Sequence, residues 1–323
     1  MLQPSPTILI PLQLVVKELK WILFLAILLY MGYKITHMEG FFHAQWLYFL
    51  SVKFSETGFY LLVSVLLSPV NCLFEALKWK EAAHSQFHLS LAKAWRGVVT
   101  GQALNLVAPL NVGHVGGRLL HLEILSDSKW KAASLVIVCQ VAQFIVTFLA
   151  FIGGIFFIGS HLSFFSQTDW MLIFVCSFLF SLLFLFLFLR FRKHRWSDEI
   201  FNEIKELDTT KVVKIFLYSV LRYLTFSTQF VLMLYFMGVE KWWLELYMAL
   251  SLVFMAKSLM PSFHFLSDLG VREFAALLVL PALGLPENVV VASSLWVWLV
   301  NIFLPSVFGS LLLLKTKTNA LFC

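Results

Sequence analysis

The chain has 323 residues, of which 60% are hydrophobic and 13% are charged. Soluble domains carry roughly 25% charged residues, so this composition excludes a water-soluble globular protein and predicts an integral membrane protein. The formal net charge is +6, but the basic residues stand in short segments between apolar runs, which argues against a nucleic-acid partner and for a role in membrane topology.

Six apolar segments are long enough to cross a bilayer, which takes about 20 apolar residues. They cover residues 16–34, 57–78, 132–159, 169–190, 213–238 and 287–314. The first segment has no cleavage site of small residues, so we expect it to remain as a transmembrane helix.

Two further apolar regions, 89–125 and 243–284, are interrupted by proline and glycine at 109–117 and 261–270. Proline breaks a helix interior and glycine permits a turn. Each region is therefore predicted to form two short helices.

The segment 190–214 is the richest in Lys and Arg, and the positive-inside rule places it in the cytoplasm. Counting crossings from this loop puts both chain termini in the cytoplasm. It also makes 89–125 a re-entrant hairpin that enters from the cytoplasmic side, and 243–284 one that enters from outside.

The predicted fold is an all-α polytopic membrane protein, a single transmembrane domain over residues 1–323. It contains two pseudo-repeats, about 15–160 and 168–315, each with two spans, a re-entrant hairpin and a further span. Three crossings are an odd number, so the second repeat is inverted relative to the first. Inverted repeats with broken helices are typical of secondary transporters.

Ionisable side chains at membrane depth are costly, so those in the hairpins are candidate site residues. His114 and Arg118 share one helical face, as do Asp268 and Arg272. An arginine fork suits phosphate, so we predict that Arg118 and Arg272 bind an anionic headgroup. The alternative is that both arginines only pair with Glu123, Asp268 or Glu273 and pin the hairpins in place. The candidates for substrate binding are Arg118, Arg272, Glu273, Asp268, His114, Lys257 and Asn105, and those for structural hinges are Pro109, Gly113, Gly117, Pro261 and Gly270.

Other polar residues in the apolar segments have simpler interpretations. Lys257 precedes Pro261 by one turn and either neutralises a headgroup or satisfies the carbonyls that the proline leaves free. Arg222 either lines the same cavity or, as we favour, extends to the cytoplasmic interface. Glu75 is predicted to pair locally with Lys78. Two glutamines, Gln140 and Gln143, are interpreted as helix-packing contacts.

No catalytic motif is present: there is no GxSxG, HExxH, Walker A loop or GxGxxG. The four cysteines lack the spacing of a zinc site. The sequence therefore predicts no enzyme activity, no cofactor and no metal.

The stretch 259–278, LMPSFHFLSDLGVREFAALL, is followed by Leu283-Gly-Leu-Pro. It resembles the flippase-like transmembrane region of the lysylphosphatidylglycerol synthase family, and the block 105–118, NLVAPLNVGHVGGR, resembles an earlier block of that family. The chain departs from the family pattern at His114, where an acidic residue is usual, and at Ser267 and Asp268, where glycines are usual. By position, the family motif residues would be Pro109, Gly113, Arg118, Gly270, Arg272 and Glu273.

The resemblance implies a role in moving lipids between leaflets. The family's soluble aminoacyl-transferase domain has no counterpart in these residues, so synthesis of a lysyl-lipid is not expected. We expect a flippase-like transporter in the inner (cytoplasmic) membrane that moves a phospholipid or another anionic or lipid-linked substrate. The alternatives are a non-transporting scaffold for a lipid- or glycan-modifying enzyme and a small membrane-embedded transferase. The sequence is also compatible with an enzyme partner in the membrane or with a homo-oligomer.

Overall fold

A computed structural model describes residues 54–106, 112–122, 129–158, 207–259 and 267–315. Within these ranges the chain forms helices and turns, with no strand. The predicted spans 16–34 and 169–190 lie outside the described residues.

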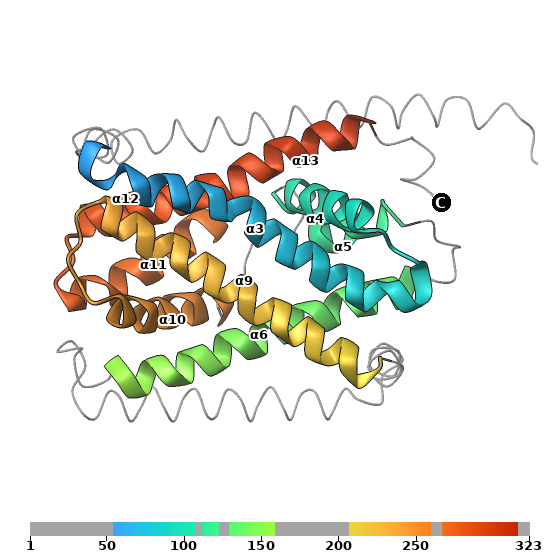
Figure 1. Ribbon diagram of the computed structural model, residues 1–323, viewed down its shortest axis with the longest axis horizontal. Helices are drawn as coiled ribbons and strands as arrows, with labels where there is room; N and C mark the ends of the chain where they lie inside the picture. The colour runs from blue at the N-terminus through green and yellow to red at the C-terminus, as the bar shows by residue number, and fades with distance from the viewer. Residues whose placement is uncertain (1–53, 107–111, 123–128, 159–206, 260–266, 316–323) are drawn as a thin grey trace, which may run out of the picture.

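Among the described residues, four helical segments are long and apolar enough to cross a membrane, and they coincide with the other four predicted spans. They are α3 (Phe54–Phe87), α6 (Lys129–Ile158), α9 (Thr209–Phe236) and a continuous run of α12 (Glu287–Trp298), η3 (Leu299–Phe303) and α13 (Leu304–Lys315). The turn η3 is π-helical, so the last span contains one wide turn. Helices α3 and α9 pack against each other through the middle of the bundle (Figure 1).

Each interrupted region forms two short helices, as predicted. The first pair is α4 (Leu91–Asn105) and α5 (Val112–Leu119), and the second is α10 (Trp243–Leu259) and α11 (Ser267–Val279). The pairs lie toward opposite ends of the long axis in Figure 1. Ser90 caps the start of α4, because its Oγ accepts a hydrogen bond from the Lys93 backbone N–H at 3.3 Å.

The predicted interruptions extended too far along the chain. Helices α5 and α11 begin before the glycines, so Gly113, Gly117 and Gly270 lie inside helices rather than in the breaks. Pro109 and Pro261 lie outside the described residues. The hinge role predicted for these five residues stays a prediction.

Glycines allow α4 and α5 to approach backbone to backbone. A methyl group added at Gly113 would overlap the backbone of Asn105, and one added at Gly117 would overlap the backbone of Gly101. Small residues one turn apart are the usual means of close packing between membrane helices. The hairpin is therefore a tight unit, and it places Arg118 at the end of α5.

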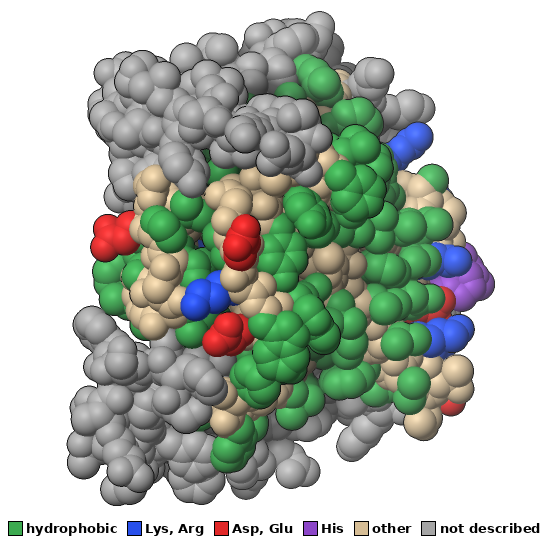
Figure 2. Space-filling model, turned by 60° about the vertical axis from the view of Figure 1, so that its left-hand side comes forward, with side chains coloured by type: hydrophobic (Ala, Val, Ile, Leu, Met, Phe, Trp, Pro, Cys, Tyr) green, Lys and Arg blue, Asp and Glu red, His purple; other side chains and the backbone are tan. Residues whose placement is uncertain are grey.

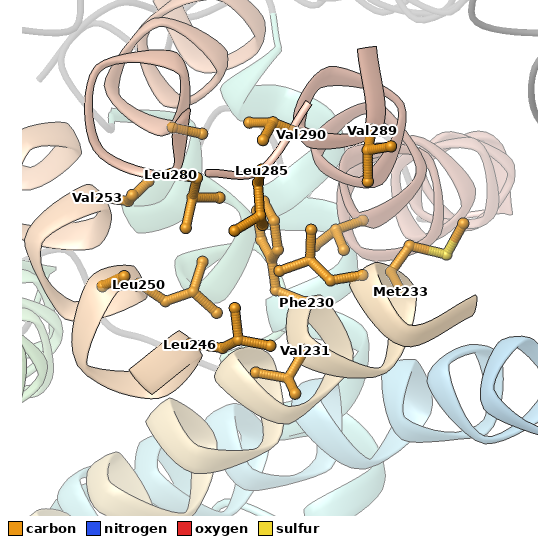
Figure 3. Close-up of a cluster of buried hydrophobic side chains, with 14 of the residues drawn as sticks. Phe230, Val231, Met233, Leu246, Leu250, Val253, Leu280, Leu285, Val289 and Val290 are labelled. Atoms are coloured by element: carbon orange, nitrogen blue, oxygen red, sulfur yellow. The ribbon is translucent and has the colours of Figure 1, made fainter. Parts of the chain in front are cut away.

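Two apolar clusters lie at different places along the bundle. One packs α9 against α10, α11 and α12, with Phe230, Leu250 and Leu285 among its buried side chains (Figure 3). The other joins α3, α4 and α6 around Trp79 and Leu135. Residues of α9 contribute to both clusters, so this helix links the two ends of the protein.

Large apolar side chains cover much of the outer surface. Phe59 and Phe156 are 70% and 73% exposed, which is a heavy cost in water but not in lipid. Figure 2 shows a mainly hydrophobic surface, with charged side chains gathered on two sides of it. This distribution identifies the protein as a membrane protein.

We expect Gly117→Ala to lower the free energy of unfolding by about 1–3 kcal/mol, because the added methyl group forces α4 and α5 apart. Thermal unfolding of the purified protein in detergent measures the change. The neighbouring Gly116→Ala is the matched control, since its methyl group would meet only Leu104 Cδ1 at 3.9 Å. Equal stability of the two variants would contradict the close packing of the hairpin.

Candidate functional site

A polar stripe runs along one face of α3. Its residues follow a spacing of four, three, four and three, which keeps them on the same side of a helix. They are Ser64, Ser68, Asn71, Glu75 and Lys78, and all are buried. In an otherwise apolar span, this stripe faces the protein interior rather than lipid.

Glu75 is the centre of a charged cluster, which we define as Glu75, Lys78, Arg118 and Arg222. Lys78 Nζ lies 2.7 Å from Glu75 Oε2, and Arg222 Nη1 lies 3.2 Å from the same oxygen. Arg118 Nη2 donates a hydrogen bond to Glu75 Oε1. The cluster therefore draws together α3, α5 and α9.

Gln143 connects a fourth helix, α6, to this cluster. Its Oε1 accepts hydrogen bonds from Lys78 Nζ and from Arg222 Nη1, each at 3.3 Å. Its Nε2 donates to the Ser219 carbonyl oxygen on α9 at 3.3 Å. The side chain thus fixes the two cations relative to each other without adding charge.

The charged cluster holds more positive than negative charge. Three cations share one carboxylate, which leaves a formal charge of +2. Lys78 and Arg118 are 1% and 2% exposed, so water does not compensate their charge, whereas the Arg222 side chain is 29% exposed and is partly solvated. An anion with two negative charges would balance it, and one with a single charge would halve it.

Several donor groups of the charged cluster have no hydrogen-bond acceptor among the described residues. They are Nε and Nη1 of Arg118 and Nε of Arg222. The Arg118 guanidinium stands 5.8 Å from the centre of the Trp79 ring, which favours a cation but accepts no conventional hydrogen bond. The arginines are thus held by Glu75 and still have capacity to bind a second acceptor.

A chain of amide side chains begins one turn away from Glu75. Asn71 donates to Asn301, Asn301 donates to Gln229, and Gln229 donates to the Ser64 carbonyl, at 3.2, 3.0 and 2.8 Å. Asn301 lies in the π-helical turn η3. In the same turn, the Val300 carbonyl accepts a hydrogen bond from Ser68 at 2.8 Å. This amide chain ties α3, α9 and the last span together.

Arg272 lies in a separate, electrically neutral network. Its Nη2 donates to Glu273 Oε1 at 3.0 Å and to the Ser294 carbonyl at 2.9 Å, and its Nε donates to Ser294 Oγ at 3.0 Å. Ser294 Oγ also donates to Glu273 Oε1 at 2.9 Å. The network fastens α11 to α12, and one carboxylate balances its one cation.

The structure distributes the predicted site residues over different environments. Arg118 and Arg272 are buried in the two networks just described, each beside a carboxylate. Arg272 pairs with Glu273, a partner that the sequence suggested, whereas Arg118 pairs with Glu75, which it did not. His114, Lys257 and Asn105 are half-buried, and the side chain of Asp268 is outside the described part of the chain.

The interpretation of Arg222 as an interfacial side chain is wrong. Its guanidinium points inward to Glu75, because that carboxylate offers a buried partner. The Glu75–Lys78 pair is confirmed, but it is one contact of a larger cluster. The regular polar spacing on α3 was the signal that could have revealed Glu75 as a centre.

The fold and the site define a polytopic helical membrane protein with a buried, cation-rich centre. A family model, lysylphosphatidylglycerol synthase TM region, matches residues 22–309. The chain therefore belongs to this family, as the sequence blocks indicated. A search of curated proteins finds no match.

We expect Glu75→Gln to destabilise the protein by about 3–5 kcal/mol, because it leaves two buried cations and the half-buried Arg222 without their counter-charge. Chemical or thermal unfolding of the purified protein in detergent measures the loss. Glu81→Gln is the control: Glu81 pairs with Lys214 at 3.5 Å near the surface, and the Lys214 side chain is 48% exposed. We expect that variant to lose less than about 1 kcal/mol. Similar losses in both variants would refute the central role of Glu75.

Proposed function

We propose that this protein is a flippase-like transporter that moves an anionic or lipid-linked substrate between the leaflets of the inner membrane. The observation that carries the proposal is the excess of positive charge in the buried cluster around Glu75. Membership of the family supports a role connected with lipid modification or lipid movement. The cluster adds a reason to expect an anionic group on the substrate.

The headgroup phosphate would bind where the arginines have free donors. Arg118 and Arg222 present planar guanidinium groups, which can donate two parallel hydrogen bonds to phosphate oxygens. Lys78 adds a point charge on the same side of α3. The substrate phosphate would then share the cations with Glu75, while its acyl chains remain in the bilayer.

Glu75 has a distinct role in this proposal. Without substrate, the carboxylate holds the three cations together and limits their mutual repulsion. With substrate, the phosphate contributes the charge that the cluster lacks. Binding then exchanges partners within a prearranged group, which costs less than bringing separate cations together in the membrane.

The proposed transport cycle uses the two short helix pairs as re-entrant hairpins of an inverted repeat. Their positions toward opposite ends of the bundle support this arrangement (Figure 1). Both chain termini are then cytoplasmic, and each hairpin closes the site from one side. Arg272 is assigned a positioning role, since its network with Glu273 and Ser294 is neutral and joins α11 to α12.

Exchange of a labelled anionic phospholipid between the leaflets of reconstituted vesicles tests the proposal. We expect Arg118→Lys to reduce the rate at least tenfold, since the variant keeps the positive charge but loses the planar fork. Arg96→Lys is the matched control, because Arg96 is an exposed arginine on the same hairpin. Its rate should equal that of the unmodified protein.

Two results would contradict transport. One is the absence of protein-dependent exchange in vesicles whose protein is folded and correctly inserted. The other is equal exchange by both arginine variants. If exchange is absent and a lipid- or glycan-modifying enzyme copurifies with the protein, the non-transporting scaffold is the better explanation.

A further inference from the structure

Two histidines lie in contact at the surface, where α3 ends. His84 is in the last turn of α3, and His88 directly follows the helix. The centroids of their rings are 6.1 Å apart, and both side chains are exposed. Figure 2 shows histidine beside basic and acidic side chains on one side of the molecule. Neither residue belongs to the charged cluster or to the amide chain, so the interactions described above do not account for this pair.

The backbone of His88 has an unusual conformation. Its φ is 43°, and in the described part of the chain it is the one residue other than glycine with a positive φ. Glycine is the usual residue in this left-handed conformation at the end of a helix, because it avoids the strain that a Cβ introduces. A histidine here accepts that strain and supplies a second imidazole next to the first.

A carboxylate precedes the two histidines at metal-ligand spacing. Glu81 and His84 are three residues apart and therefore share one face of α3. A Glu-x-x-His pair on a helix is a ligand pattern of helical metalloproteins, and two histidines four residues apart are a zinc-binding pattern. The stretch from Glu81 to His88 combines both patterns.

The Glu81 carboxylate is turned toward α9 in the structure. It pairs with Lys214 at 3.5 Å, and the Lys214 side chain is 48% exposed. Among the described residues, no three His, Cys, Asp or Glu side chains are gathered around one point. An exposed ion pair of this kind adds little stability, so Glu81 can leave Lys214 for a stronger partner beside the histidines.

We propose that Glu81, His84 and His88 bind a divalent transition-metal ion, with water completing its coordination. Zinc–nitrogen bonds of about 2 Å place two ligating rings roughly 5–6 Å apart at their centroids, a separation that these exposed rings reach with a small rotation. Imidazole ligands favour zinc, copper, nickel or iron over magnesium and calcium. The expectation of no metal rested on the spacing of the cysteines, and this site uses none of them.

The metal site would lie at the joint between α3 and the first hairpin. Leu89, the residue after His88, is 2% exposed and packs in the apolar cluster around Trp79. Ser90 then caps α4. A metal ion held by His88 and by two side chains of α3 would fasten the end of that helix to the segment that leads into the hairpin. This role is independent of what the protein transports.

Calorimetric titration of the purified full chain with Zn²⁺, after removal of any polyhistidine tag, tests the inference. We expect at least one ion to bind per chain, and Mg²⁺ to give no binding heat. His84→Gln and His88→Gln should each weaken Zn²⁺ binding at least about tenfold, since even the loss of a group that only supports a metal ligand has an effect of this size. Absence of Zn²⁺ binding, or unchanged affinity in both variants, would overturn the inference.

Three further variants separate ligation from structural damage. His121→Gln changes a half-buried histidine in the turn after α5 and should keep the affinity; a loss equal to that of His84→Gln would overturn the assignment to the pair. Lys214→Gln frees Glu81 and should strengthen Zn²⁺ binding about two- to fivefold, a direction that damage to the fold does not produce. Glu81→Gln should weaken binding, and full affinity in that variant would overturn the three-ligand site.

Discussion

The Glu75 carboxylate is the constraint on which the centre of this protein depends. It attracts three cations from α3, α5 and α9, and Gln143 brings α6 to the same place. In lipid there is no hydrophobic force between apolar helices, so polar contacts of this kind carry much of the specificity of packing. Without the carboxylate, the three cations would repel one another with only neutral partners, Gln143 and the Trp79 ring, to hold them.

The glycine-lined contact between α4 and α5 and the charged cluster support each other. Arg118 can approach Glu75 because Gly113 and Gly117 let α5 lie directly on α4. The ion pair in turn holds the short α5, whose eight residues are too few for a stable isolated helix. Local backbone packing and a buried charge interaction are thus two parts of one arrangement.

Much of the fold followed from the sequence because its signals are local. Apolar length predicted the four described spans, and proline with glycine predicted the two pairs of short helices. The partners of the buried charges could not be predicted in the same way. Arg118 and Glu75 are 43 residues apart, and only the folded hairpin brings them together. Arg222 was assigned to the membrane interface from its position in the sequence. That position does not show that Glu75 on the neighbouring helix α3 offers an acceptor.

The π-helical turn η3 separates two parts of the last span that pack against different helices. Before it, α12 is fastened to α11 through Ser294 and Arg272; after it, α13 packs against α4, with Gly309 against the backbone of Val99. A wide turn carries one extra residue, so the helix face presented after it is rotated relative to the face before it. Because Val300 and Asn301 of η3 are bonded to α3 and α9, the turn sets the separate faces by which α12 meets α11 and α13 meets α4.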